Sequence, residues 1–384
     1  MLRKILIAVA ALIVILLAAG IYVIRMGVRG LARDERMTQQ QLQPRVIKGA
    51  GQFKKQSFYT AAELGNISEI LAGWPADRED ATLAVVGNRG AHFLDQSGRP
   101  IKRVRFSRNI FCPVEISRLD ASGDYGFLTR EQSWSCPVIL FDRQGQERWS
   151  YSAGLLSAVD DAVSFTIDGS ITPNVVLGLN GGGGLVLLDG QGKRIWQKPE
   201  GNVWHVEALD TNADGQKEIL HSDARGHLLV RNHSGDVIGR YLPGVYVSHF
   251  TVTRWGSDVQ PSHILVPVNE GSEGANPELL VLDAGGKTLA HLEAPLENFM
   301  VDVKATPVRY GRNAEYYAVL SNKRASTPRS MLLLYAGGGQ LAYQEIIGDD
   351  CRGIAALPGN SGERLLVGCI GNVFEYSPVD SSPQ

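Results

Sequence analysis

The sequence predicts an all-β fold, a seven-bladed β-propeller preceded by one N-terminal transmembrane helix. Three observations predict it. A pattern of two short apolar strands around a glycine-ended turn recurs along the chain. Glycine is abundant, at 43 of 384 residues, while the aromatic content is only 8%, and the chain opens on a long apolar stretch. Abundant glycine beside few aromatic residues is typical of a β-rich protein with many turns. Six or eight blades are the alternatives to seven.

The predicted helix is the stretch Ile5–Ile24, which holds 20 residues without a charged side chain. At about 1.5 Å per residue it spans roughly 30 Å, the thickness of the hydrocarbon core of a bilayer. Its small residues Ala18, Ala19 and Gly20 are followed by more apolar sequence, which favours an uncleaved anchor over a cleaved signal peptide. A cleaved signal is the alternative. Basic residues lie on both sides of the stretch, so the positive-inside rule does not decide its orientation.

The strand–turn–strand pattern occurs six times, for example as VILFDRQGQERWSY (138–151) and LVLLDGQGKRIWQK (185–198). Asp or Asn at the start of the turn and Gly at its end provide the side-chain-to-backbone hydrogen bond and the positive φ that a hairpin needs. Successive turns are separated by 47, 47, 43, 51 and 53 residues, and they begin at Asp95, Asp142, Asp189, Asn232, Asp283 and Ala336.

Two further strands precede each turn, so each unit has the four short antiparallel strands of a propeller blade. One such sheet cannot bury both of its faces, and the units must therefore pack side by side and close into a ring. The seventh unit ends at its third strand, NVFEYSP (372–378), and we expect QFKKQSFYT (52–60) to supply the missing outer strand. The predicted organisation is a tail (1–4), a transmembrane anchor (5–24), a polar linker (25–51), the propeller (52–377) and a disordered tail (378–384).

The segments 138–151 and 184–198 resemble the repeats of quinoprotein-dehydrogenase-like (PQQ-like) propellers, and DTNADGQKEI (210–219) is similar to the calcium loop of FG-GAP/VCBS repeats. The two resemblances together span about residues 60–377 and imply a propeller architecture. In PQQ dehydrogenases a quinone cofactor lies over the channel, with dedicated ligands and a vicinal disulfide. This chain has no adjacent cysteines and no ring of tryptophans repeated in every unit. We therefore predict no quinone cofactor.

The loop 210–218 is a candidate calcium site between the first and second strands of the fourth blade. Oxygen-bearing side chains at alternate positions around a glycine are the donor set that Ca²⁺ prefers. Burying three carboxylates together without a cation would be costly. We predict one structural calcium ion, with a merely polar Asx-type loop as the alternative. The ligands would be Asp210, Asn212, Asp214, Gln216 through its carbonyl, and Glu218.

The four cysteines form two pairs along the chain, separated by 24 and 18 residues. An even number of cysteines, clustered by pair behind an export-like N-terminus, predicts two disulfides and an oxidising compartment. Four buried free thiols in a cytosolic domain are the alternative. The predicted pairs are Cys112 with Cys136 and Cys351 with Cys369.

Polar residues on the innermost strands are the other candidate site, because these strands line the central channel of a propeller. His205 and Glu207 lie two residues apart and would share one face of a strand. With His249 in the next blade they form a conceivable metal or acid–base site. Solvated or mutually bonded polar side chains are the plainer reading. The channel candidates are Glu115, His205, Glu207, His249, Asp302, Lys304 and Arg352.

Charge is distributed unevenly along the chain. Residues 1–56 carry ten Lys and Arg against two acidic residues, and residues 57–384 carry 28 against 38. A body with net charge −10 repels phosphate backbones, so nucleic acid is excluded as a partner. Neither a nucleophile elbow nor a zincin helix occurs in the sequence.

We therefore expect a non-enzymatic, membrane-anchored scaffold that binds envelope or membrane proteins, as a single-pass membrane protein with an extracytoplasmic propeller (periplasmic face of the inner membrane if the source is bacterial). The membrane contact would be made by the N-terminal helix. One alternative is a carbohydrate-binding protein, or a quinone-dependent or polysaccharide-acting enzyme, that uses the channel mouth. A second is a calcium-dependent sensor or adhesion module. Because unrelated functions share propeller folds, the fold by itself does not choose among them.

Overall fold

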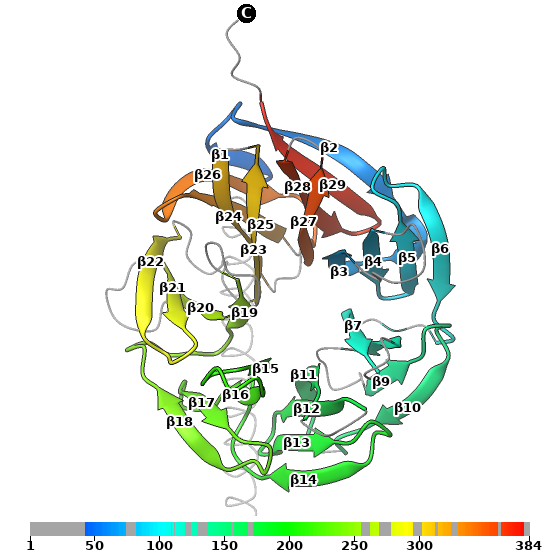
Figure 1. The fold of residues 1–384 in the computed structure, drawn as a ribbon, viewed down its shortest axis with the longest axis vertical. Helices are drawn as coiled ribbons and strands as arrows, with labels where there is room; N and C mark the ends of the chain where they lie inside the picture. Colours follow the sequence, from blue (N-terminus) through cyan, green and yellow to red (C-terminus); the bar gives the residue numbers. More distant parts are fainter. Residues whose placement is uncertain are drawn as a thin grey trace, which may run out of the picture. The chain divides into compact units, whose positions relative to one another are not determined.

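The structure is a computed structural model that describes residues 43–73, 82–108, 110, 112–119, 124–129, 137–154, 157–167, 172–254, 262–268, 278–294, 302–311, 314–323, 329–359 and 362–379. The chain divides into two compact units, 1–44 and 45–384. The described strands all belong to the second unit and form seven sheets, which confirms the all-β, seven-bladed propeller (Figure 1).

The first four blades are contiguous in sequence. Blade one contains β3 (Ile67–Ala72), β4 (Leu83–Gly87), β5 (Gly90–Leu94) and β6 (Pro100–Arg105). Blade two contains β7 (Val114–Arg118), β8 (Tyr125–Thr129), β9 (Val138–Phe141) and β10 (Glu147–Tyr151). Blade three contains β11 (Val159–Phe165), β12 (Asn174–Leu179), β13 (Gly184–Leu188) and β14 (Arg194–Lys198). Blade four contains β15 (Val206–Leu209), β16 (Glu218–Ser222), β17 (Leu228–Arg231) and β18 (Val237–Tyr241).

Blade five is contiguous like the first four, with β19 (Thr251–Thr253), β20 (His263–Val268), β21 (Glu278–Asp283) and β22 (Thr288–Glu293). The last two blades, six and seven, combine strands from both ends of the unit. Blade six contains β23 (Asp302–Tyr310), β24 (Ala314–Lys323), β25 (Arg329–Ala336), β26 (Gln340–Ile347) and the N-terminal β1 (Arg45–Lys48). Blade seven contains β27 (Gly353–Gly359), β28 (Gly362–Cys369), β29 (Asn372–Pro378) and β2 (Phe53–Thr60). A 3-10 turn, η1 (Ala62–Leu64), follows β2.

The ring closes as the sequence predicts. β2 runs antiparallel to β29, with Phe53 opposite Pro378 and Thr60 opposite Asn372, so it supplies the fourth strand of blade seven. The inner strand of each blade contacts the inner strand of the next, including β27 with β3. β1 was not predicted as a strand, since residues 45–48 lie in the segment expected to be a linker. It pairs with β26, so the two N-terminal strands join adjacent blades (Figure 1).

The turns explain why the repeat folds as it does. In blade one the Asp95 Oδ1 accepts hydrogen bonds from the backbone N–H groups of Ser97 and Arg99, both at 2.9 Å. The N–H of Gly98, at φ 87°, donates to the Asp95 carbonyl. The same side-chain bonds recur at Asp142, Asp189 and Asn232. Each turn therefore sets the register of the hairpin that forms the outer half of its blade.

Outer-strand aromatic residues join neighbouring blades. The Trp149 indole N–H donates to the Gly190 carbonyl in the turn of the next blade, and the Trp196 indole N–H donates to the His233 carbonyl in the one after. Tyr241 makes the corresponding bond to the Ala284 carbonyl. Apolar strand residues fill the space between adjacent sheets. The packing is thus repeated from blade to blade, as expected for units that cannot bury both faces alone.

The membrane prediction is corrected by the structure. Within the described ranges, no helix has the length and apolar character needed to cross a bilayer. This finding overturns the expectation of a single-pass membrane protein with an extracytoplasmic propeller. The segment Ile5–Ile24, on which that expectation depended, lies outside the described residues.

Candidate functional site

The inner strands hold most of the predicted channel residues, and the rest lie next to them. Glu115 is on β7, Glu207 on β15, and Asp302 and Lys304 on β23. His205, His249 and Arg352 lie within two residues before the starts of β15, β19 and β27. The structure brings these residues together in two groups. We call them the acid–histidine group (Asp161, His205, Glu207 and His249) and the lysine–arginine group (Asn66, Ser68, Lys304, Asp350 and Arg352).

The acid–histidine group joins blades three, four and five. The His205 Nδ1 lies 2.6 Å from the Asp161 Oδ2, and the His205 Nε2 lies 3.6 Å from the Glu207 Oε1. The imidazole also meets the Phe250 ring edge-on at 4.7 Å, and the His249 ring is 5.8 Å away. Asp161 and His205 are both buried. His205 thus lies between a buried carboxylate and a partly buried one, an arrangement suited to holding a proton.

Asp161 was not a sequence-based candidate, although it organises this group. Its Oδ2 accepts a hydrogen bond from the Val206 N–H at 3.0 Å, and its Oδ1 accepts one from its neighbour Ala162 at 2.9 Å. A β11 side chain therefore binds the backbone of β15. The sequence signal that could have identified Asp161 is its place as an acidic residue on the predicted inner strand of blade three. It lies 45 residues before Val206, whose N–H it accepts.

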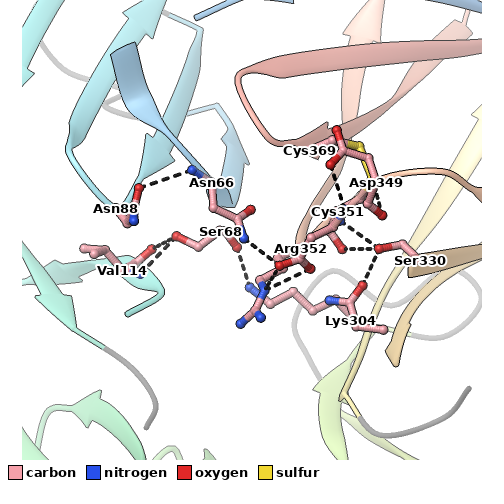
Figure 2. Close-up of polar contacts among 12 residues, drawn as sticks. Asn66, Ser68, Asn88, Val114, Lys304, Ser330, Asp349, Cys351, Arg352 and Cys369 are labelled. Atoms are coloured by element: carbon pink, nitrogen blue, oxygen red, sulfur yellow. Dashed lines mark hydrogen bonds and ion pairs between the residues drawn. A yellow bond between two sulfur atoms is a disulfide. The ribbon is translucent and has the colours of Figure 1, made fainter. Parts of the chain in front are cut away.

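The lysine–arginine group closes the ring at its inner edge (Figure 2). The Lys304 Nζ donates to the Ser68 carbonyl at 2.8 Å, which links blade six to blade one past blade seven. The Arg352 Nε lies 3.2 Å from both Asp350 carboxylate oxygens, and the Asn66 side-chain amide donates to Asp350 Oδ2 at 2.7 Å. Asp350 is buried. Its charge is therefore offset by a guanidinium and an amide, as a buried carboxylate requires.

Short hydroxyl side chains make further bonds between neighbouring blades, from the inner strand β3 in one case and from β25 of blade six in the other. The Ser68 Oγ donates to the Val114 carbonyl at 2.7 Å and accepts from the Val114 N–H at 2.9 Å. The Ser330 Oγ has the same two bonds to the backbone of Cys351 (Figure 2). The inner ring is thus held by side-chain-to-backbone bonds. This geometry supports mutually bonded polar residues, the plainer of the two sequence-based readings.

The structure does not support a metal site in the inner ring. In the described part of the chain, no three His, Cys, Asp or Glu side chains are placed to hold an ion. The same statement covers the loop 210–218 between β15 and β16. There, the Glu218 Oε2 accepts from the Thr211 N–H and hydroxyl at 2.8 and 2.6 Å. The Asp210 Oδ2 accepts from the Gly215 N–H at 2.8 Å. The loop is closed by its own hydrogen bonds, and calcium binding stays a prediction.

The cysteine prediction is confirmed for the pair in blade seven. Cys351 and Cys369 form a disulfide between the residue that precedes β27 by two positions and the end of β28 (Figure 2). Cys112 is also disulfide-bonded. Cys136, its predicted partner, lies outside the described residues.

Comparisons with known proteins identify the fold. No family model and no curated protein match the chain. A solved structure of BBS1N in complex with ARL6DN matches with a TM-score of 0.52 at 9% identity, over 88% of this chain and 97% of that one. The WD40 domain of Pan2 from Neurospora crassa matches with a TM-score of 0.49 at 12% identity, over 86% and 97%. BamB from Moraxella catarrhalis matches with a TM-score of 0.44 at 13% identity, over 87% and 98%.

Identities this low show the fold alone. The BBS1N match, with a TM-score of 0.52, agrees with the fold that the sequence predicts. With no family model matching, the likeness to PQQ-like and FG-GAP/VCBS repeats stays a prediction. The chain has the architecture of a seven-bladed β-propeller.

Proposed function

We propose that this propeller is a platform for binding partner proteins. The observation that carries the proposal is a set of three exposed apolar side chains at the outer side of blade four: Ile238, Leu242 and Tyr246. These side chains are 55%, 72% and 54% exposed, although the strand residues behind them are buried. Ile238 and Leu242 lie on one face of the same extended segment, because side chains alternate along a strand. Apolar side chains that are this exposed are candidate contacts for a partner protein, since burying them against a partner removes apolar surface from water.

Two further observations support a binding role. β18 is the outermost strand of its sheet, and among the described strands none pairs with its second edge. Such an edge presents backbone donors and acceptors to an extended segment of another chain. The solved BBS1N propeller, which has a similar fold, is itself in a complex with ARL6DN.

The test is site-specific photocrosslinking in cells that make the protein. A photoreactive residue at Leu242 should crosslink a discrete partner, and Ile238→Asp should abolish that product. The control is Leu289 on β22, which has the position on blade five that Ile238 has on blade four and is 47% exposed. Equal crosslinking at 242 and 289, or none at 242, would contradict the proposal.

The acid–histidine group supports a second candidate, an enzyme or carbohydrate-binding protein that uses the inner ring. His205, between Asp161 and Glu207, could accept a proton from a sugar hydroxyl. Glu207→Gln keeps the shape of the side chain, so it should abolish sugar binding or turnover while leaving the melting temperature within about 1 °C. If it lowers only stability, or changes nothing, the group is structural.

We also propose that the loop 210–218 binds one calcium ion, with Asp210, Asn212, Asp214, Gln216 and Glu218 as ligands. The alternation of oxygen donors around Gly215, which has φ 90°, supports the proposal. Binding would require carboxylates that now accept loop N–H groups to exchange those bonds for the ion.

A further inference from the structure

The outer edge of blade six carries an added strand. β1 lies antiparallel on β26, which makes blade six a sheet of five strands where the other blades have four (Figure 1). All four β1 residues are exposed, and Arg45 pairs with Ile346 and Val46 with Glu345. Backbone pairing therefore holds a strand that buries little of its own side-chain surface. The fold can thus accept a fifth strand on the outside of a blade.

The other six blades end on outer strands whose second edge pairs with no strand in the described part of the chain. These strands are β2, β6, β10, β14, β18 and β22. An exposed edge of this kind is a template for pairing with another chain, and charged side chains are the usual protection against such pairing. The charge on each strand therefore indicates which of the six edges is open.

Four of the six edges are protected by charge. β2, β6, β10 and β14 read FKKQSFYT, PIKRVR, ERWSY and RIWQK, so each has two or three charged side chains. β22 reads TLAHLE and is partly engaged by blade six, because the Glu293 carbonyl at its end accepts a hydrogen bond from the Tyr335 hydroxyl at 2.9 Å. The remaining strand is β18, in blade four.

β18 reads VIGRY and has one charged residue, Arg240. Val237 and Ile238 are 50% and 55% exposed. Gly239 follows the bulge, at the place where β14 has Trp196. A Cβ added at Gly239 would meet only Val230, at 3.4 Å, and a glycine inside a strand can mark a place where another backbone approaches closely. Of the six edges, β18 is therefore the most open to an incoming strand.

A segment from another molecule differs from β1 in one respect. β1 is tethered to β26 by the chain itself, whereas a separate segment must offset the loss of its own freedom. It therefore needs side-chain contacts as well as backbone bonds. β18 offers the exposed apolar side chains of Val237 and Ile238, and Arg240 is exposed as well. A carboxylate next to Arg240 across the strand pair adds an attraction.

We propose that β18 accepts an extended, mainly apolar segment of a partner protein as a fifth strand, with a carboxylate of that segment beside Arg240. This inference rests on the proposed function and specifies how the partner binds blade four. Main-chain hydrogen bonds provide the affinity, and the side chains of Val237, Ile238 and Arg240 select the segment.

The first test uses a fluorescein-labelled peptide, Thr-Val-Glu-Val-Thr-Val-amide, titrated into the full chain and followed by fluorescence anisotropy. The control peptide has the same sequence with two consecutive N-methylated residues, which blocks both of its edges because neighbouring amides of a strand point to opposite sides. The parent peptide should bind at least about tenfold more tightly, since the control cannot make the main-chain bonds. Equal binding of the two peptides would overturn the proposal.

Variants test whether the peptide pairs with β18. Arg240→Glu should weaken the parent peptide about two- to fivefold and favour a peptide with Lys in place of Glu by a similar factor. Ile238→Asp should also weaken the parent peptide, whereas Leu289→Asp, at the equivalent position of β22, should leave its affinity unchanged. An Arg240→Glu chain that does not discriminate between the two peptides would contradict the proposed register.

Hydrogen exchange locates the added strand directly. When the parent peptide binds, the amides of 237–241 that point away from β17 should gain protection, and the amides of β22 should not. Protection gained on β26 instead would mean that the peptide displaces β1, and this result would overturn the assignment to β18.

The experiments separate this inference from the proposed function. A crosslink at Leu242 in cells, together with equal binding of the two peptides, keeps the platform and overturns strand addition. Specific pairing of the parent peptide without a crosslink at Leu242 supports the open edge and contradicts the platform. If the purified chain forms dimers that Ile238→Asp dissociates, a second copy occupies the edge and the proposal of a partner segment is wrong.

Discussion

Blade four and blade seven are similar four-stranded sheets that are assembled in different ways. Blade four is a continuous run from Val206 to Tyr241, in which each strand pairs with the next along the chain. Blade seven takes three strands from the C-terminal end and its outer strand, β2, from the N-terminal end. A local hairpin costs little loop entropy, whereas pairing of distant segments must be stabilised by packing. The seam between the chain ends should therefore be where the ring is most sensitive to mutation.

The contacts at the seam fit this expectation. On β2, Phe53 is buried against the rings of Tyr310, Tyr316 and Tyr343. Lys55 on the same strand forms an ion pair at 2.9 Å with Glu345 of blade six. By contrast, Ile238 on the corresponding outer strand of blade four is exposed. The outer strand is thus anchored by core packing at the seam and by its own hairpin elsewhere.

The largest effect is expected from Phe53→Ala. Loss of a buried phenylalanine leaves a cavity among three tyrosines, and the free energy of unfolding should fall by about 4 kcal/mol. Ile238→Ala, the control on blade four, should change it by less than about 0.5 kcal/mol. Urea denaturation followed by circular dichroism measures both. Equal effects would show that the two outer strands are anchored alike.

The disulfide in blade seven should contribute next. The double variant Cys351→Ser/Cys369→Ser loses a cross-link over 18 residues, and stability should fall by about 3 kcal/mol. The double variant is preferred to a reducing agent because Cys112 is also disulfide-bonded. A loss below about 0.5 kcal/mol would mean that the strand pairing alone holds blade seven.

Lowering the pH should destabilise blade four through His221 on β16. Burial lowers the pKa of His221 to about 4, and its Nε2 accepts a hydrogen bond from Arg231 at 2.8 Å while its Nδ1 contacts the Ser222 carbonyl. The unfolded chain, with an ordinary histidine pKa near 6.5, binds this proton first, so stability is lost as pH falls from about 6.5 towards 4.

Between pH 7 and pH 5 this residue should account for a loss of about 2 kcal/mol. His221→Gln should flatten that part of the pH–stability profile, measured by urea denaturation at each pH. His291→Gln is the control, because His291 is exposed on β22. An unchanged slope in His221→Gln would contradict the assignment.

The smallest expected effect is that of calcium on the loop 210–218. At a calcium concentration ten times the dissociation constant, binding should stabilise the chain by about 1.4 kcal/mol. Asp214→Asn should remove this gain, whereas Asp236→Asn, which changes an exposed acid in the turn between β17 and β18, should keep it. A thermal melt that does not respond to millimolar calcium would leave the loop as a polar turn.

The comparison also shows what a sequence can and cannot predict. The blades could be predicted because the Asp-to-Gly turns are local and their hydrogen bonds form within four residues. Closure by β2 could be predicted because the seventh unit lacked one strand. β1 could not, since Arg45–Lys48 is short and wholly exposed, and only the free edge of β26 makes it a strand.

The site residues divide in the same way. Residues on or next to the inner strands could be placed from the repeat, which located His205, Glu207, Lys304 and Arg352. Their partners Asp161, Asp350 and Ser68 were missed, because each is chosen by how neighbouring blades pack. The bonds from Tyr317 and Tyr335 of blade six to Thr253 and Glu293 of blade five were missed for the same reason.

Native-state hydrogen exchange of the peptide 53–60 tests most directly whether the chain ends close the ring. If β2 is the fourth strand of blade seven, its paired amides should be protected to the same free energy as those of β28, within about 1 kcal/mol, since both open only when the seam unfolds. Exchange of the β2 amides within seconds, while β28 stays protected for hours, would contradict the closure.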